Sequence, residues 1–150
     1  MKNVKDAYKE YAVTLNQCDK ALDDLYHEYA ASWHISDAAL WVLYAIYDAE
    51  ETITQADICS CWFFSRQTIN TALKGLEQQG VIALESVPGN RKSKAIRFTQ
   101  EGMKTAEGIL EPLLEAERKV FNTLSDEENR IFAELSQKRC SLLREYLKTV

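Results

Sequence analysis

The chain has 150 residues, of which 46% are hydrophobic, and a formal net charge of −5 at pH 7. This length and apolar content suit one folded domain, and no run approaches the roughly 20 apolar residues that a membrane-spanning helix needs. The first residues, MKNVKDAYKE, lack the apolar segment of a secretion signal, so a cytoplasmic protein is expected. The acidic balance, taken alone, argues against nucleic acid as a partner.

A helix with a regular apolar period is predicted at the start of the chain. Its apolar positions are spaced alternately four and three residues apart, which is the heptad spacing of a helix that packs against another helix. These positions are Val4, Tyr8, Tyr11, Leu15, Cys18, Leu22, Leu25 and Tyr29. A seam of this length predicts a partner helix, either in the same chain or in a second copy.

Aromatic residues gather around the start of the next predicted helix. Apolar walls with a few polar tips suit an aromatic or phenolic ligand. The candidate lining is Trp33, His34, Trp41 and Tyr44. The same residues are equally compatible with a core between the first two helices, and the sequence leaves both interpretations open.

The middle of the chain is predicted to form a helix, a turn, a second helix and a β-hairpin. Thr54, with Asp57 as its partner, is expected to cap a short helix, TQADICSCW, and Phe63-Phe64 to form the turn. Ser65 is the expected N-cap of SRQTINTALKGLEQQ, which Gly80 ends. The strands VIALESV and KAIRF then flank a basic turn, PGNRKS. This order predicts a winged helix-turn-helix, which most often binds duplex DNA.

The second helix of this motif separates into two faces. The residues expected to pack inward are Ile69, Ala72, Leu73 and Leu76. The opposite face is polar but almost uncharged, which favours the reading of base edges over an ordinary solvated surface. Its members are Gln67, Asn70, Thr71 and Lys74. At the N-terminus, where free amides favour a phosphate, lie Ser65, Arg66 and Thr68.

Positive charge is concentrated in the same region. Residues 62–99 carry six basic and two acidic side chains, a net charge of +4, against −7 for residues 1–61 and −2 for residues 100–150. In the predicted wing the candidate DNA contacts are Arg91, Lys92 and Lys94. Because cations coincide with the motif, double-stranded DNA becomes the expected partner despite the acidic total.

Two long helices are expected after the hairpin. The first runs from Gln100 to about Leu124 and contains Pro112, which is expected to kink or break it. Ser125 and Glu128 form a capping box that opens the last helix. The predicted fold is therefore mainly α with a small β-hairpin. A helical dimerisation frame (1–32 and 100–150) encloses a winged helix-turn-helix lobe at about 36–99 within a single domain.

The chain resembles the MarR family of bacterial transcription regulators. The matching phrases are ISDAALWVLYAIYDAEETITQADIC, SRQTINTALKGLEQQGVIALES, AIRFTQEG and LSDEE. The resemblance implies a homodimer, often a repressor, that binds a pseudo-palindromic operator and is released by a ligand or an oxidant. It also implies that the aromatic candidates border a crevice beside the DNA-binding lobe. Many members carry an Asp-x-Arg-Asp-type motif in the wing. In this chain the wing reads PGNRKSKAIRF. By position, the resemblance assigns the role of the motif's arginine to Arg91, with Lys92 and Lys94 as alternatives.

The sequence contains no set of residues typical of an enzyme active site, and no catalytic residue, metal or cofactor is expected. The four cysteines, Cys18, Cys59, Cys61 and Cys140, are expected to be reduced, and the first three are expected to behave as small buried apolar side chains. Cys59 and Cys61, with His27 and His34, do not match a zinc-ligand spacing. Two alternatives stay open. One is a zinc- or thiol-responsive regulator of the same fold, and the other is a winged-helix protein-interaction module that does not read bases.

Overall fold

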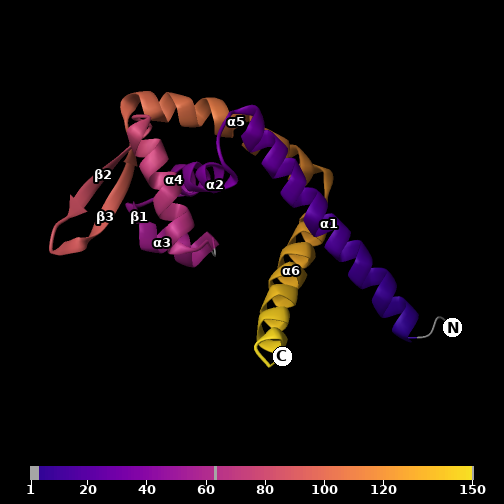
Figure 1. Cartoon of the computed structure of the whole chain (residues 1–150). Coiled ribbons are helices and arrows are strands. Elements are labelled where there is room, and N and C mark those ends of the chain that lie inside the picture. The colour runs from indigo at the N-terminus through magenta and orange to yellow at the C-terminus, as the bar shows by residue number, and fades with distance from the viewer. Residues whose placement is uncertain (1–3, 63, 150) are drawn as a thin grey trace. The chain divides into compact units, whose positions relative to one another are not determined.

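The structure, a computed structural model, describes residues 4–62 and 64–149, and the side chains of all of these except residues 4–6 and 90–92. This part of the chain forms six helices and a three-stranded antiparallel sheet (Figure 1). The predicted fold class, mainly α with a small β element, is confirmed. The chain divides into two compact units, Met1–Ile109 and Leu110–Val150.

The first unit holds the helix-turn-helix and its wing. In chain order its elements are α1 (Val4–Ser32), α2 (Asp37–Asp48), β1 (Ile53–Thr54), α3 (Gln55–Trp62), α4 (Arg66–Gln78), β2 (Ile82–Val87), β3 (Asn90–Phe98) and the start of α5 (Gln100–Thr123). Its largest fully buried side chains come from α2, α3, α4 and β2. The inward face predicted for the second motif helix is confirmed, because all four of its apolar residues are buried in α4.

The sheet is larger than the predicted hairpin. β1 pairs antiparallel with β3, with Ile53 opposite Ile96, so β3 lies between β1 and β2. β3 also begins at Asn90 and not at Lys94, because the chain turns within Pro88-Gly89 alone. The prediction that PGNRKS forms a six-residue turn is therefore wrong, and its basic residues lie on a strand.

The end of α4 is fixed by a glycine in the left-handed region. Gly80 has a φ of 70°, and its N–H donates to the Glu77 carbonyl at 2.9 Å. The Val81 N–H donates to the Leu76 carbonyl, also at 2.9 Å. These two bonds form a Schellman motif, which satisfies carbonyls at the helix end and brings the next residue back onto the helix. The predicted stop at Gly80 is confirmed.

Thr99 joins this helix end to the start of α5. Its hydroxyl donates to the Gly80 carbonyl at 2.6 Å and accepts from the Gly102 N–H at 2.9 Å. Gly102 is buried, and a Cβ added there would overlap the carbonyl of Val81. The phrases LKGLEQQGVI and FTQEG, separate in the sequence, thus form the two sides of one joint.

The second unit contains the rest of α5 and α6 (Asp126–Leu147). Ser125 caps α6 as predicted: its N–H donates to Glu128 Oε2 at 2.8 Å, and its Oγ accepts from the Glu128 N–H at 3.2 Å. α5 is one helix through Pro112, so Pro112 does not break it, and the alternative of a kink stays a prediction. The carbonyl that loses its donor, that of Gly108, belongs to an exposed residue with open space around it, so water can replace the lost bond.

Many large apolar side chains of the long helices are exposed in the single chain. On α1 the predicted seam leaves Tyr8, Tyr11 and Leu25 more than 60% exposed. α6 has no buried residue. Its exposed apolar side chains are Ile131, Phe132, Leu135, Leu142, Leu143, Tyr146 and Leu147. In an isolated chain these surfaces would face water.

Cys18, Cys59 and Cys61 depart from the expectation of burial. Cys18, Cys61 and Cys140 are exposed and Cys59 is half-buried, and all four are free thiols. Cys18 and Cys140 lie on α1 and α6, whose apolar side chains are exposed as well, so their burial requires something outside the single chain.

Among the described residues, no helix is long and apolar enough to cross a membrane.

Candidate nucleic-acid interface

The helix-turn-helix is fixed by local capping at both of its helices. Thr54 and Asp57 form the predicted capping pair: the Thr54 N–H donates to Asp57 Oδ2 at 2.8 Å, and the Asp57 N–H donates to Thr54 Oγ1 at 3.4 Å. Gln55 Nε2 donates to the Arg66 carbonyl at 3.1 Å, which ties the first turn of α3 to the first turn of α4. Of the predicted turn, Phe64 is half-buried and Phe63 lies outside the described residues.

The N-terminus of α4 has the predicted cap. Ser65 Oγ accepts from the Thr68 N–H at 3.1 Å and lies 2.7 Å from Thr68 Oγ1. The first turn carries no acidic side chain, and Arg66 and Gln67 are exposed there. No carboxylate of the first turn therefore competes with an external anion for the free amides and the positive end of the helix dipole.

The predicted reading face of α4 is exposed, and the structure divides it between two hollows. Gln67, Asn70, Thr71 and Lys74 are all exposed. Gln67 and Thr71 lie on the side of α2, together with Thr68. Asn70 and Lys74 lie on the side of the wing, together with Arg66. Sequence spacing alone had placed all of these residues on one surface.

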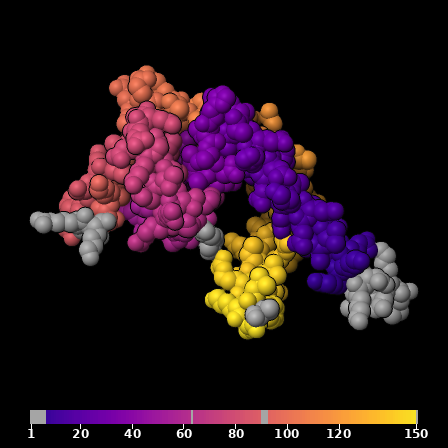
Figure 2. All heavy atoms as spheres, viewed as in Figure 1, coloured from indigo at the N-terminus to yellow at the C-terminus, as the bar shows by residue number. Residues whose placement is uncertain are grey.

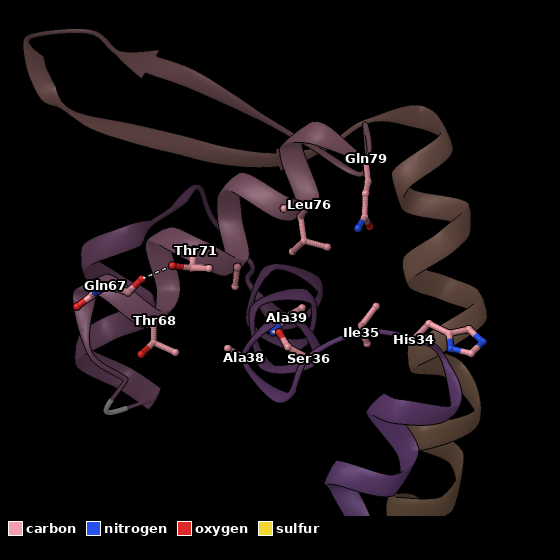
Figure 3. A pocket seen from close by; sticks show the side chains of 12 residues that line it. His34, Ile35, Ser36, Ala38, Ala39, Gln67, Thr68, Thr71, Leu76 and Gln79 are labelled. Atoms are coloured by element: carbon pink, nitrogen blue, oxygen red, sulfur yellow. Dashed lines mark hydrogen bonds between the residues drawn. The ribbon is translucent and has the colours of Figure 1, made fainter.

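The hollow on the first side, here called the α2-side pocket, has a volume of about 490 Å³. In Figure 3 the side chains of Gln67 and Thr71 on α4 lie opposite Ala38 and Ala39 on α2, and His34 stands at the far end. The Thr71 hydroxyl is already bonded to the Gln67 carbonyl at 3.0 Å. The lining of the pocket thus contains no Asp, Glu, Lys or Arg.

The hollow on the second side, here called the wing-side groove, has a volume of about 640 Å³. It brings together Arg66, Asn70 and Lys74 of α4 with Lys94 of β3. Figure 2 shows α3 and α4 (magenta) and the hairpin (salmon) as one continuous surface. Three cations face one carboxylate, that of Glu77, so the groove favours a polyanion.

The wing contributes cations of two kinds. Lys94 is exposed and lines the groove, whereas Arg97 Nε is paired with Glu85 Oε2 at 3.1 Å and its Nη2 donates to Thr52 Oγ1 at 3.2 Å. Arg97, although part of the positive count in the sequence, is thus held by its neighbours. The side chains of Arg91 and Lys92 lie outside the described part of the chain; their backbone is at the start of β3.

Known proteins share this arrangement. The sequence model of the MarR family matches residues 35–93, which run from just before α2 into the wing. The HTH-type transcriptional regulator PecS of Dickeya dadantii (strain 3937) is 29% identical over 80 residues. That stretch is 53% of this chain and 48% of PecS, so the chain spans about half the length of this curated relative.

The fold has close counterparts among solved structures. S. aureus MepR in its DNA-binding conformation gives a TM-score of 0.75 at 22% identity, over 88% of this chain and 98% of MepR. A MepR–DNA complex gives 0.70 at 22% identity, over 88% and 97%. NMB1585, a MarR family regulator from Neisseria meningitidis, gives 0.75 at 22% identity, over 91% and 96%. At this identity the structures establish the fold alone.

The part of the chain from residue 35 to residue 93 matches the MarR family. Proteins of that family are transcription regulators and not enzymes, which agrees with the prediction of a non-enzymatic protein. Within the described residues, no three His, Cys, Asp or Glu side chains are grouped as a metal site requires.

In this chain the four aromatic ligand candidates do not surround one pocket. Trp33 is 43% exposed in the turn after α1, where His34 has a φ of 57°. Trp41 and Tyr44 instead belong to a cluster of four rings that also contains Tyr26 and Trp62.

Sequence reasoning missed two members of this ring cluster. Tyr26 lies on α1 outside the heptad seam, and Trp62 is the last residue of α3. Their contacts with Trp41 join three helices, which spacing along one helix does not reveal. The one signal in the sequence for the role of Tyr26 was its position on a helical wheel, which lies off the heptad seam.

Proposed function

We propose that this protein is a sequence-specific, double-stranded-DNA-binding transcription regulator of the bacterial cytoplasm. The observation that carries the proposal is the wing-side groove, where the polar face of α4 and the cationic side of β3 meet. Asn70 offers the donor and acceptor pair that reads adenine, while Arg66, Lys74 and Lys94 offer charge to phosphates. We assign the remaining predicted DNA contacts, Ser65, Gln67, Thr68, Thr71, Arg91 and Lys92, to the same surface.

The proposed DNA-binding form is a homodimer held by α1, α5 and α6. The exposed apolar side chains of these helices support it, because leaving each of them in water forfeits roughly 1–2 kcal/mol of burial. A two-fold dimer binds a pseudo-palindromic operator whose half-sites are about one helical turn apart. MepR, which has the same fold, was solved in complex with DNA.

We propose further that the protein represses and that an effector relieves repression. An effector releases DNA only if it binds the non-competent dimer more tightly than the DNA-competent one. His34 lines the α2-side pocket beside α4, and Trp41 and Tyr44 belong to the ring cluster; we keep these three as candidate ligand contacts. Trp33 is the fourth candidate on sequence grounds.

The test is a mobility-shift titration with the DNA upstream of the protein's own gene, at several salt concentrations, against random DNA of the same length. The expected result is a preference for the upstream DNA and an affinity that falls steeply with salt. An Arg91→Ala/Lys92→Ala/Lys94→Ala variant should bind both DNAs more weakly, with a flatter salt dependence.

The outcome also separates the proposal from the alternative of a protein-interaction module. Such a module would show equal, weak binding to both DNAs, and would thereby contradict sequence-specific regulation. Unchanged affinity and salt slope in the triple-alanine variant would remove the wing from the mechanism.

A further inference from the structure

A third hollow of the first unit differs in chemistry from the two that flank α4. It has a volume of about 540 Å³ and lies between α1, the start of α2 and Phe64, the residue just before the N-cap of α4. Rings and carboxylates line it together. We call it the acidic aromatic pocket, and it is distinct from the wing-side groove and from the α2-side pocket, with which it shares no residue.

The aromatic wall of this pocket is fixed from behind. Trp41 packs against Tyr26 at a centroid distance of 4.8 Å and stacks on Trp62 at 5.1 Å. Tyr44 closes the cluster at 5.7 Å from Trp41. Tyr26, Trp41 and Phe64 are all half-buried, so each has one part in the protein and another part accessible to a ligand. A wall of packed rings needs little ordering when a ligand binds.

The charge of the pocket is negative. Asp23, Asp24 and Asp37 line it, against one lysine, Lys20. Lys20 Nζ is 2.7 Å from Asp24 Oδ1, and His27 Nδ1 is 2.9 Å from Asp37 Oδ1. With histidine neutral, three carboxylates and one ammonium leave a net charge of −2. An anion is repelled by this lining and a cation is attracted.

We propose that the acidic aromatic pocket binds an organic cation, namely an aromatic ring that carries a quaternary or protonated ammonium group. The half-buried rings of Tyr26, Trp41 and Phe64 line the pocket and provide cation–π attraction, and the carboxylates provide charge. The sequence favoured an aromatic or phenolic ligand, and the lining of this pocket adds the requirement of a positive charge. The effector role of the cation rests on the proposed function, whereas its binding does not.

The position of the pocket links it to DNA binding. Phe64 is followed directly by Ser65, the N-cap of α4, and Asp37 and Trp41 belong to α2, which packs on α4. A ligand that contacts Phe64 and Trp41 therefore acts on both supports of the helix that carries Asn70. Its occupancy shifts the angle at which α4 is presented, and this gives the differential affinity that release requires.

Isothermal titration calorimetry of the full chain without DNA tests the binding. The probes are phenyltrimethylammonium and benzenesulfonate, which share a phenyl ring and a tetrahedral group but have opposite charges. The expected result is saturable binding of the cation and at least tenfold weaker binding of the anion. Equal binding of the two probes, or tighter binding of benzenesulfonate, would overturn the proposal.

An isosteric variant locates the site. Asp23→Asn/Asp24→Asn should weaken phenyltrimethylammonium binding by about tenfold. The control Glu107→Gln/Glu145→Gln removes the same charge from residues outside the pocket and should bind as the wild type does. An unchanged affinity in the first variant would overturn the assignment. Trp41→Leu tests the aromatic wall separately from the carboxylates. With an unchanged melting temperature, this variant should also lose cation binding.

A final arm separates this inference from the proposed function. Mobility shifts with the upstream DNA are repeated with 1 mM phenyltrimethylammonium, for the wild type and for Asp23→Asn/Asp24→Asn. Weaker DNA binding in the wild type alone supports the effector role. Cation binding without sequence-specific DNA binding would refute the proposed function and leave the pocket assigned. DNA binding that the bound cation leaves unchanged would refute the effector role.

Discussion

Asn70 and Gln78 are both exposed amide side chains of α4, but they differ in what they face. Asn70 lines the wing-side groove together with Arg66 and Lys94, whereas Gln78 is the last residue of the helix and lines neither hollow beside it. This difference allows the reading of bases to be separated from a general change in the surface of the helix.

Asn70→Ala should reduce the discrimination between operator and random DNA by about 1–3 kcal/mol, because the variant cannot make a bidentate hydrogen bond to a base. Competition mobility shifts measure this ratio. Gln67→Ala, on the other side of α4, tests the α2-side residues in the same assay. Gln78→Ala is the matched control and should keep the ratio; a loss of equal size in Gln78→Ala would show that the effect comes from the helix and not from a base contact.

Lys94→Ala should weaken binding to all DNA sequences and lower the salt slope by about one unit, because the variant has one fewer cation to pair with a phosphate. Arg97→Ala removes a cation from the same strand, but one that is already paired with Glu85. It should therefore change the slope less. Equal slopes for Lys94→Ala and the wild type would contradict the assignment of Lys94 to a phosphate.

At the scale of elements, the joint between α4 and α5 depends on two glycines with different duties. Gly80 supplies a left-handed backbone, while Gly102 supplies the space for the Val81 carbonyl. Gly108, six residues later on α5, has open space around it and no such duty. A methyl group added at Gly102 is therefore expected to have the opposite effect on stability from one added at Gly108.

Gly102→Ala should destabilise the protein by about 1–3 kcal/mol, because the added methyl forces α5 away from Val81. Gly108→Ala should instead stabilise it by about 0.5–1 kcal/mol through its helix propensity. Urea unfolding measures both. A Gly102→Ala protein as stable as the wild type would show that the close approach does not exist in solution.

The capping box of α6 predicts a dependence on acid. Bonds from the Ser125 N–H and hydroxyl hold the pKa of Glu128 below its ordinary value of 4.5. The carboxylate's contribution to stability is therefore complete above pH 4.5 and is lost as the pH falls through the lowered pKa. Thermal melts between pH 6 and pH 3 should show a larger loss for the wild type than for Glu128→Gln, which does not titrate. Identical losses would refute the link.

Short-range signals in the sequence made most of the helix ends predictable. Ser65, Gly80 and Ser125 act on amides and carbonyls within four residues, so their types and spacing reveal the caps. β1 was missed because a two-residue strand has no pattern of its own and exists only through its pairing with β3. The acidic aromatic pocket was missed for the same reason, since Asp23 and Phe64 meet only in the fold.

For the whole molecule, the exposed apolar side chains of α1, α5 and α6 pose the largest question of stability. α6 has no buried residue in the single chain, and isolated helices of about 20 residues are marginal in water. In the proposed homodimer, a second copy that covers these helices would provide the packing that the single chain lacks.

Phe132→Glu should dissociate the dimer, because it places a charge where an apolar side chain is expected to be buried on association. Gln137→Glu adds the same charge at an exposed polar position of α6 and is the control. Light scattering at micromolar concentration should give a dimer for the wild type and the control. A folded wild-type monomer would refute the dimer.

The uneven distribution of charge has a consequence for how the protein would find DNA, its proposed partner. The first 61 residues have a net charge of −7 and residues 62–99 a net charge of +4, and both stretches belong to the same unit. Such a molecule has an electric dipole, so the field of a DNA duplex turns it before contact, pulling the wing inward and pushing α1 outward. Productive encounters then become a larger fraction of collisions, and added salt slows association more than it speeds dissociation.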